Sequence, residues 1–446
     1  MKVDPSIFKA YDIRGVYPLQ LNEKAAYLVG RSFAEFLKPK KVIVGRDMRL
    51  SGPVLKKNLI DGLTDQGVDV VDVGMVSTDA YYFVCSKLGI PGIMVTASHN
   101  PKEFNGFKMV RKMPYLLSGD EGIQDIRRLV EEGKFSKVTK KGKIIKRDYT
   151  GQFIKRVLSF VNIKEIRPLK VIADTANGMV GPFLTNLYSN LPVKLKLIYG
   201  KPDGNLPNHG LDPLMPENRE KIEKLVVSEK ADLGFMFDGD GDRFFVIDDR
   251  GKFVSGDFLT AILGKYLLEK HPGSKIIYDI RASWAVPDLI AESGGKSMFE
   301  RVGHAFIKRR MADENGLFAG EITGHYYFRD FNYSDSGLIP SLLVLEMLSR
   351  KKVKMSDLLK PLEQKYFISG EINSKVADPV SKIKQLTKKY NDGQQNMLDG
   401  ITVFYNDWHF NVRISNTESL LRLNVDAKSK TLMESKRDEI LALIRS

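Results

Sequence analysis

Short apolar runs that end near an aspartate recur along the chain. The three clearest are "KKVIVGRD" from Lys40, "LKVIADTANG" from Leu169 and "SKIIYDIRAS" from Ser274. β-Branched runs of this length predict buried parallel strands, and the helical pattern "SGPVLKKNLIDGLTDQG" after the first completes a strand-helix unit. The pattern therefore predicts three related α/β layers, although the identity between them is too low to establish a repeat.

The pattern of apolar and polar residues changes after Phe367. The segments "GITVFYNDWHFNVRIS" and "LLRLNVDA" alternate apolar and polar residues, whereas Lys382 to Tyr390 and "TLMESKRDEILALI" have helical periodicity. This combination predicts an α+β module of hairpin strands with helices on one side. We therefore expect four domains that pack together around shared clefts: α/β domains at residues 1–149, 150–250 and 251–367, and an α+β domain at 368–446.

Composition limits the class of protein. The 446 residues are 43% hydrophobic and 28% charged, which fits a globular chain of several domains. The longest apolar runs are interrupted by Lys265 and Glu346, so they predict buried helices rather than membrane spans. The N-terminus lacks the apolar core of a signal peptide, and Cys85 is the single cysteine. These features predict a cytoplasmic protein without disulfides.

The chain carries 69 basic and 55 acidic residues, a net charge of +14. The lysines are spread along the sequence, and the densest cluster, at Lys137 to Asp148, is a short run rather than a basic tail. This distribution favours a small anionic substrate and a generally basic surface over nucleic-acid binding.

The stretch "DLGFMFDGDGDRFFVID" concentrates charge between two apolar runs. Asp238, Asp240 and Asp242 would repel one another unless a hard divalent cation bound them, and the intervening glycines allow a tight loop. A solvated acidic turn is the alternative. An EF-hand fits poorly, because its sixth position, glycine, is Arg243 here and its flanks are strand-like. We interpret the stretch as a Mg²⁺ site in which Arg243 holds a phosphate or carboxylate.

The sequence "VTASHNP" places Ser98 directly after a predicted buried strand. It is either a polar turn or a nucleophile held at the end of a strand. Three aspartates supply only part of a magnesium shell, and a phosphate on Ser98 would add an anionic oxygen. Ser98 would then carry a phosphoryl group. The neighbouring His99 is expected to shape the loop, since adjacency in sequence does not place its ring on Ser98.

Two further stretches carry candidate binding groups. "RISNTESLLRLNVD" could bind a phosphate through two arginines and loop donors, or it could be only a polar hairpin. "GEITGHYYF" offers a carboxylate and a hydroxyl to sugar hydroxyls, or it could be an ordinary loop. The candidate residues are Arg413, Ser415, Asn416, Thr417 and Arg422 in the first stretch, and Glu321, Thr323 and His325 in the second.

These stretches together resemble the α-D-phosphohexomutase superfamily, and within it the phosphomannomutase/phosphoglucomutase branch. The resemblance spans essentially the whole chain in order: "KAYDIRG", "GRDMRLSG", "TASHNP" with "NGFK", "PDGNLPNHGLDPLMPEN", "DGDGDR", "GHAFIKRRM", "GEITGHYYF" and "RISNTE". It implies three mixed α/β domains and a C-terminal α+β domain around one central cleft, in agreement with the pattern above.

The resemblance also implies residue roles. Ser98 corresponds to the phosphorylated serine and a metal ligand, together with Asp238, Asp240 and Asp242. Glu321 and Thr323 correspond to the sugar loop. Arg413, Ser415, Asn416 and Thr417 correspond to the distal phosphate clamp, to which the residue pattern adds Arg422 as a further substrate-binding residue. Tyr11, Arg14, Lys108, Arg243, His304, Lys308 and His325 match cleft positions. Of these, Arg14, Lys108, Arg243 and His304 are expected to serve catalysis with Ser98. Lys108, His304 and His325 are candidates for the general acid or base.

The implied activity is reversible interconversion of mannose 6-phosphate and mannose 1-phosphate, with Mg²⁺, a phosphoserine and a hexose 1,6-bisphosphate. The protein is expected to be a monomer or homodimer that binds no nucleic acid or membrane. Glucose phosphates are alternative substrates. Gly241 and Ile322 depart from the amino-sugar branch and disfavour, without excluding, a phosphoglucosamine mutase. A magnesium-dependent sugar phosphatase and a non-catalytic sugar-phosphate sensor are rivals of other classes.

Overall fold

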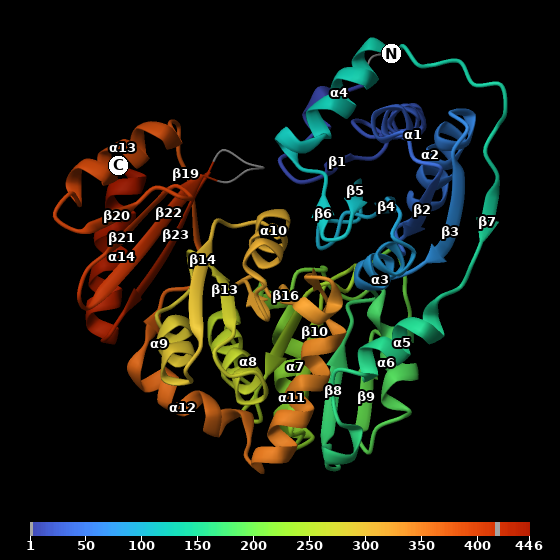
Figure 1. The fold of residues 1–446 in the computed structure, drawn as a ribbon. Coiled ribbons are helices and arrows are strands. Elements are labelled where there is room, and N and C mark those ends of the chain that lie inside the picture. Colours follow the sequence, from blue (N-terminus) through green and yellow to red (C-terminus); the bar gives the residue numbers. More distant parts are fainter. Residues whose placement is uncertain (1–2, 415–419) are drawn as a thin grey trace. The chain divides into compact units, whose positions relative to one another are not determined.

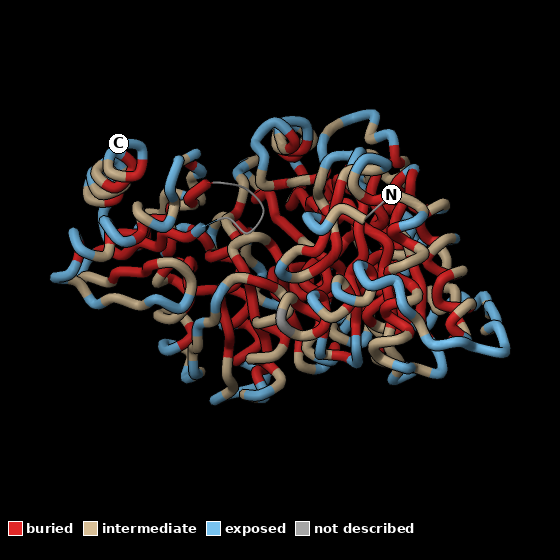
Figure 2. Tube along the Cα trace, turned by 90° about the horizontal axis from the view of Figure 1, so that it is seen from above, coloured by how far each residue is buried: buried red, intermediate tan, exposed pale blue. Residues whose placement is uncertain are grey.

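The computed structural model describes residues 3–414 and 420–446. The chain forms two compact units: residues 1–254 with 323–354, and residues 255–322 with 355–446. Figure 1 shows the ribbon coloured along the sequence. In Figure 2, long inner stretches of the Cα trace are buried, whereas exposed residues concentrate at the outer bends of the trace.

The first unit begins with a mixed sheet. Across the sheet the strands are β1 (Ile13–Val16), β5 (Phe104–Lys112), β4 (Gly92–Val95), β2 (Lys41–Arg46), β3 (Asp69–Met75) and β7 (Ile144–Lys146), with β6 (Tyr115–Leu116) beside β5. Its helices are α1 (Glu23–Leu37), α2 (Gly52–Asp65), α3 (Thr78–Leu88) and α4 (Ile123–Glu132). Helices α1 and α2 lie side by side (Figure 1) and share one apolar core with the sheet.

A second sheet follows in the same unit. Its order is β12 (Phe253–Val254), β11 (Phe244–Ile247), β10 (Leu233–Phe237), β8 (Lys170–Asp174) and β9 (Lys194–Ile198), and its helices are α5 (Thr150–Leu158), α6 (Val180–Tyr188) and α7 (Pro216–Ser228). β8 and β10 are parallel, whereas β10 and β11 are antiparallel neighbours. The six residues between β10 and β11 are therefore a tight loop at one edge of the sheet, and they contain the acidic triplet.

Residues 323–354 complete this unit with β16 (Tyr326–Phe328), β17 (Ser334–Asp335) and α11 (Leu338–Lys351). Every residue of α11 from Leu338 to Ser349 is buried. Apart from Ser341, Glu346 and Ser349 this stretch is apolar, as expected for a helix surrounded by protein. The prediction of a buried helix here is confirmed.

The second unit contains the parallel strands β14 (Lys296–Glu300), β13 (Lys275–Asp279) and β15 (Phe318–Gly320). Four helices belong to this part of the chain: α8 (Gly256–Lys270), α9 (Ala285–Glu292), α10 (His304–Glu314) and α12 (Met355–Lys365). Ser255 is the N-cap residue of α8, and its side chain accepts a hydrogen bond from the backbone N–H of Phe258.

The rest of the second unit is a mainly antiparallel sheet with two helices. The strands are β18 (Phe367–Ile368), β19 (Ile372–Lys375), β20 (Gln394–Asn396), β21 (Ile401–Phe404), β22 (Trp408–Ile414) and β23 (Leu420–Ala427), and the helices are α13 (Pro379–Lys389) and α14 (Lys430–Arg445). One apolar cluster joins both helices to the sheet, so both cover the same face.

The predicted architecture is confirmed: the chain is a mixed α/β protein with an α+β module at its C-terminus. The three apolar runs that end near aspartates are β2, β8 and β13. Within the described part of the chain, no helix is both long enough and apolar enough to span a membrane. The four domain boundaries stay a prediction.

Candidate active site

Ser98 lies in the loop that connects β4 to β5. It is 3% exposed, and its φ of 48° is a left-handed conformation that residues with a Cβ rarely adopt. Its N–H donates to Thr96 Oγ1 at 2.9 Å. The loop therefore holds this serine in a left-handed conformation that is less favourable for a residue with a Cβ.

The side chain of Arg49 is hydrogen-bonded to the backbone of the Ser98 loop. Its side chain is 1% exposed and donates to four loop carbonyls, those of Ser98 (2.8 Å), Asn100 (2.7 Å), Pro101 (2.7 Å) and Phe104 (2.9 Å). Its Nε lies 3.2 Å from Asp47 Oδ2. The sequence motif "GRDMRLSG" contains both residues, but the sequence analysis gave neither of them a role.

The sheet register brings Arg14 and Lys108 to this loop. β5 pairs with β4 through Met94 and Lys108, and with β1 through Arg14 and Gly106. Arg14 Nη1 donates to the Ala97 carbonyl at 3.3 Å and also to Asn100 Oδ1. Two basic side chains that are distant in sequence therefore lie beside the Ser98 loop.

The acidic loop between β10 and β11 approaches the Ser98 loop closely. A Cβ at Gly239 would lie 2.7 Å from the carbonyl oxygen of Ser98, so only glycine allows this approach. Gly241 has a φ of 80°, which lets the loop turn back within six residues. These are the physical reasons for the two glycines of "DGDGDR".

The acidic loop has the donor set of a metal site. Asp238, Asp240 and Asp242 are at most 1% exposed, and each offers a carboxylate oxygen within 4.8 Å of the others. Asp240 Oδ1 and Asp242 Oδ1 are buried without a hydrogen-bond partner among the described residues. Burial, and next the charge of Asp240, raises the pKa of Asp238 well above its usual value. Oxygen donors that lack partners in a buried acidic group fit a hard divalent cation.

Lys108 pairs with two of these aspartates. Its Nζ lies 2.8 Å from Asp240 Oδ2 and 2.5 Å from Asp242 Oδ2. Burial by itself would lower the pKa of Lys108, but the two carboxylates outweigh burial and raise it. Thr78 Oγ1 also donates to Asp240 Oδ2, at 2.6 Å. The ammonium group therefore brings positive charge into the acidic site.

Ser98 and the acidic loop meet directly. Ser98 Oγ donates to Asp238 Oδ2 at 2.7 Å, across 140 residues of sequence. The ring of His99 also lies close to Ser98, with Nδ1 3.3 Å from Ser98 Oγ. Adjacency in sequence alone did not predict this contact. The structure thus brings the predicted nucleophile onto a predicted metal ligand.

Arg243 and His325 form a pair in the same unit. Arg243 Nε donates to His325 Nε2 at 3.0 Å, and the backbones of the two residues form a β-bridge. His325 Nδ1 lies 3.0 Å from Asp335 Oδ2. Sequence analysis gave no role to Asp335, and the only signal for it is the "NYSDSG" segment that follows the histidine loop.

A cavity of about 510 Å³ lies beside the Ser98 loop. One wall is residues 99–103, and the other comes from Asn205, His209 and their neighbours up to Asn218. His209 Nε2 lies 3.1 Å from Asp174 Oδ2. The motif "PDGNLPNHGLDPLMPEN" therefore packs around the loop that carries Ser98.

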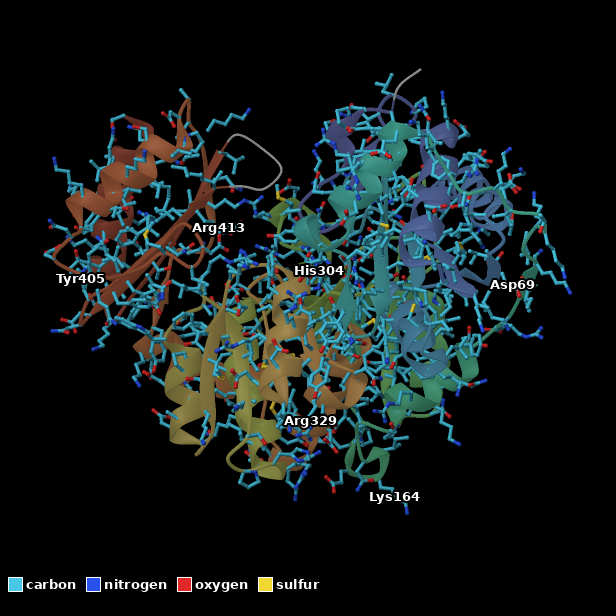
Figure 3. All side chains as sticks on the ribbon, turned by 45° about the horizontal axis from the view of Figure 1, so that its top comes forward. Asp69, Lys164, His304, Arg329, Tyr405 and Arg413 are labelled. Atoms are coloured by element: carbon cyan, nitrogen blue, oxygen red, sulfur yellow. The ribbon has the colours of Figure 1, made fainter. Side chains whose placement is uncertain are left out.

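In the second unit, α10 carries two of the predicted residues. His304 is its first residue and Lys308, one turn later, is fully buried, so both lie on the same face of the helix. The N–H of Val302 donates to Asp399 Oδ2 at 2.9 Å, which ties the start of α10 to the C-terminal module. Figure 3 labels His304 on α10 and Arg413 on β22.

Three arginines surround Glu371 in the second unit. Arg281 Nη1 and Arg422 Nη1 each lie 2.8 Å from a Glu371 oxygen, and Arg413 Nη2 lies 3.6 Å away. Burial alone would raise the pKa of Glu371, but the three guanidinium groups lower it to about 2. Arg281 also pairs with Asp279 at 2.9 Å and approaches Glu321 to 4.0 Å. Sequence analysis assigned no role to Arg281 or Glu371.

The structure groups the predicted residues by unit. Those in the first unit are Tyr11, Arg14, Ser98, Lys108, Asp238, Asp240, Asp242, Arg243, Thr323 and His325; those in the second are His304, Lys308, Glu321, Arg413 and Arg422. Ser415, Asn416 and Thr417 lie outside the described residues.

Four family models match successive parts of the chain. They are described as phosphoglucomutase/phosphomannomutase alpha/beta/alpha domain I (residues 5–137), domain II (149–251) and domain III (255–366), and the C-terminal domain (371–443). Together the matches cover most of the sequence.

Individual relatives agree with these matches. A phosphomannomutase of Escherichia coli K12 is 41% identical over 448 residues, which cover 98% of both chains. Phosphohexose mutases of Xanthomonas campestris are 38% identical over 442 residues, covering 98% of this chain and 99% of theirs. A solved family protein from Burkholderia thailandensis superposes with a TM-score of 0.89 at 33% identity, covering 99% of this chain and 97% of its own.

Proposed function

The chain belongs to the phosphoglucomutase/phosphomannomutase family, and we propose that it is a phosphomannomutase that interconverts mannose 6-phosphate and mannose 1-phosphate. The observation that carries the mechanism is the 2.7 Å contact between Ser98 Oγ and Asp238 Oδ2. It joins a candidate phosphoryl carrier to a candidate metal ligand. The identity to named phosphomannomutases supports mannose phosphate as the substrate.

In the proposed reaction, phosphorylated Ser98 transfers its phosphoryl group to the free hydroxyl of a bound hexose phosphate. The Oγ–P bond breaks as the sugar O–P bond forms, and the proton released by the sugar hydroxyl is balanced by the proton that Ser98 Oγ takes up. The resulting hexose 1,6-bisphosphate turns end for end, and Ser98 accepts the other phosphoryl group. The same bisphosphate activates unphosphorylated enzyme by this return step.

The residues of the proposed site have separate roles. Arg49 holds the Ser98 loop, while Lys108 and Arg243 bring positive charge to the transferring group, as phosphoryl transfer requires. Asp238, Asp240 and Asp242 would hold a Mg²⁺ ion, which would supply Lewis-acid stabilisation to the transferring group. We assign the non-transferring phosphate to Arg413 and Arg422, with Ser415, Asn416 and Thr417, and the sugar hydroxyls to Glu321 and Thr323.

The remaining assignments are also proposals. Tyr11, Arg14, His304, Lys308 and His325 serve substrate binding or proton transfer. The four domains end near Tyr149, Arg250 and Phe367. The enzyme works in the cytoplasm as a monomer or homodimer, on a small-molecule hexose phosphate and without nucleic-acid or membrane partners.

Phosphorus NMR tests the proposal. The purified protein is mixed with Mg²⁺, a trace of hexose 1,6-bisphosphate and mannose 1-phosphate, with glucose 1-phosphate and glucosamine 1-phosphate in parallel samples. We expect a sugar 6-phosphate signal to grow fastest with mannose 1-phosphate and without inorganic phosphate. Faster turnover of another sugar would reassign the substrate, release of inorganic phosphate would indicate a phosphatase, and no reaction in any sample would favour a sensor.

A further inference from the structure

Thr78 contacts the acidic loop from another element. Its side-chain Oγ1 donates to Asp240 Oδ2 at 2.6 Å, and its backbone N–H donates to the carbonyl oxygen of Asp240 at 2.8 Å. Both residues are fully buried, so these hydrogen bonds are closed to water. One residue therefore holds both the backbone and the carboxylate of a candidate metal ligand, across 162 residues of sequence.

The start of helix α3 brings Thr78 to this position. Thr78 is the first residue of the helix, where a backbone N–H has no acceptor within the helix and can donate to another element. The neighbouring Asp79 fixes the first turn, because its Oδ1 accepts from the Ala80 N–H at 2.8 Å and its Oδ2 accepts from Ser336 Oγ at 2.6 Å. Ser336 lies between β17 and α11, so a second part of the first unit holds the helix start in place.

A second threonine near Asp240 has a different acceptor. Thr96 Oγ1 lies 3.3 Å from Asp240 Oδ2 but 2.7 Å from Asp47 Oδ2. A hydroxyl has a single proton to donate, and the shorter distance assigns that proton to Asp47. Thr78 is therefore the threonine whose hydroxyl donates to Asp240.

The two carboxylate oxygens of Asp240 have different surroundings. Oδ2 accepts from Thr78 and from Lys108 Nζ, whereas Oδ1 is buried without a hydrogen-bond partner among the described residues. Asp242 is divided in the same way: Lys108 lies 2.5 Å from its Oδ2, and the ring of His325 is 3.7 Å from its Oδ1, beyond hydrogen-bond distance. A buried oxygen without a partner is unfavourable, and a hard cation is the partner that suits two such oxygens.

The two donors to Asp240 Oδ2 differ in how strictly they orient the carboxylate. Lys108 has a flexible stem, and its ammonium group is shared between Asp240 and Asp242. Thr78 has a short β-branched side chain with few rotamers, on a helix that is itself held in place. The hydroxyl of Thr78 is therefore the group that fixes the orientation of the Asp240 carboxylate.

We propose that Thr78 is a positioning residue for the divalent cation of phosphoryl transfer: its hydroxyl holds Asp240 Oδ2, so that Oδ1 is the oxygen presented to the ion. The inference rests on the Mg²⁺ site of the proposed function. It deepens that function, because it gives the start of α3 a part in metal binding. Sequence analysis assigned no role to Thr78.

Binding of Mn²⁺, followed by electron paramagnetic resonance of the free ion, tests this role without any substrate. Thr78→Val and Thr78→Ala remove the hydroxyl, whereas Thr78→Ser retains it. Groups that orient metal ligands typically change metal affinity by 10- to 100-fold, so we expect the Kd for Mn²⁺ to rise about 10- to 100-fold in the first two variants and less than about threefold in Thr78→Ser. Intact-mass measurements select samples with the same phosphorylation state at Ser98, since a phosphate there would add an oxygen ligand.

The Mg²⁺ dependence of turnover tests the same role in the working enzyme. In Thr78→Val, the Mg²⁺ concentration that gives half-maximal kcat should rise about tenfold or more. The KM for hexose phosphate should change less than about threefold, because other residues bind the sugar and its second phosphate. A lower kcat with an unchanged Mg²⁺ dependence would show that Thr78 does not act through the cation, and would overturn the proposal.

A matched control separates positioning from folding. Thr64→Val removes the hydroxyl of another buried threonine, in the last turn of α2, where Oγ1 donates to the Asp61 carbonyl at 3.1 Å. It should lower the melting temperature but leave the Kd for Mn²⁺ unchanged. If Thr78→Val and Thr78→Ala also leave that Kd unchanged, Thr78 is structural and the proposal fails, as it does if wild type binds no Mn²⁺. Mn²⁺ binding that depends on the Thr78 hydroxyl, in a protein without mutase activity, would remove the proposed function and support the positioning role.

Discussion

The backbone of Ser98 has an unfavourable conformation. A residue with a Cβ at a φ of 48° costs about 1 kcal/mol or more relative to an ordinary conformation. The hydrogen bond from its N–H to Thr96 Oγ1 and the one from Arg49 to its carbonyl stabilise that conformation. At the residue scale, the structure therefore holds the hydroxyl of Ser98 against Asp238.

Removal of the Ser98 hydroxyl should abolish turnover without unfolding the protein. We expect Ser98→Ala and Ser98→Gly each to lower kcat by at least about 1000-fold, because no group remains to carry the phosphoryl group. Glycine adopts positive φ without strain, so Ser98→Gly should be at least as stable as Ser98→Ala. Phosphoryl transfer from hexose bisphosphate to the protein measures the loss of the carrier, and thermal unfolding measures the stability of the two variants. Full turnover in either variant would contradict the carrier role.

Asp257 should make stability depend on pH. Burial, followed by the charges of Asp279 and Asp426, raises its pKa to about 8. Between about pH 4 and pH 8 the folded protein retains a proton that the unfolded chain has released, so this contribution to stability falls as pH rises. Asn cannot ionise. The free energy of unfolding of Asp257→Asn minus that of wild type should therefore increase by roughly 1–3 kcal/mol between pH 5 and pH 8.

Urea unfolding at the two pH values measures this difference. The control is Asp407→Asn, whose carboxylate is 66% exposed and should give the same difference from wild type at both pH values. A constant difference for Asp257→Asn would mean that this carboxyl does not titrate in that range.

At the scale of elements, the Ser98 loop depends on one side chain from outside it. Arg49 donates to four carbonyls of residues 98–104, and of these the Pro101 carbonyl also accepts from the Phe104 N–H at 3.1 Å. Asp47 lies against Arg49 and also accepts from Thr96 Oγ1 at 2.7 Å. The connection between β2 and α2 thus supports the connection between β4 and β5.

Arg49→Lys should loosen the loop. A lysine has a single nitrogen and cannot reach four carbonyls, so buried acceptors lose their donors. We expect kcat to fall by about 100-fold and backbone hydrogen exchange in residues 98–104 to accelerate. Arg127→Lys, on an exposed face of α4, is the matched control and should change neither. Unchanged exchange in the loop would show that Arg49 is not what holds it.

At the scale of the whole molecule, the arginine group around Glu371 joins separate parts of the second unit. Arg281 follows β13, whereas Arg413 and Arg422 are direct cross-strand partners on β22 and β23. Two like charges in that register repel each other, and the carboxylate of Glu371 reduces this repulsion. One carboxylate thus connects the parallel strands to the C-terminal module.

Glu371→Gln should weaken both stability and substrate binding. Loss of the carboxylate removes an ion-pair partner from Arg281 and Arg413, whose side chains are at most 5% exposed, which costs about 2–4 kcal/mol in the free energy of unfolding. We also expect KM for hexose phosphate to rise about tenfold as Arg413 and Arg422 move apart. Glu434→Gln on α14, where the carboxylate is 45% exposed, should change neither quantity. Unchanged stability in Glu371→Gln would refute the connecting role.

Local residue patterns were enough to predict the elements and the chemistry of individual stretches. Apolar periodicity depends only on neighbouring residues, so it predicted β2, β8, β13 and the C-terminal module, and the spacing of Asp238, Asp240 and Asp242 predicted a metal site. Only the tertiary structure decided which distant groups meet. Ser98 and Asp238 are 140 residues apart, and Arg49, Asp335 and Glu371 have partners on other elements. Such contacts depend on strand order and register, which local patterns do not encode.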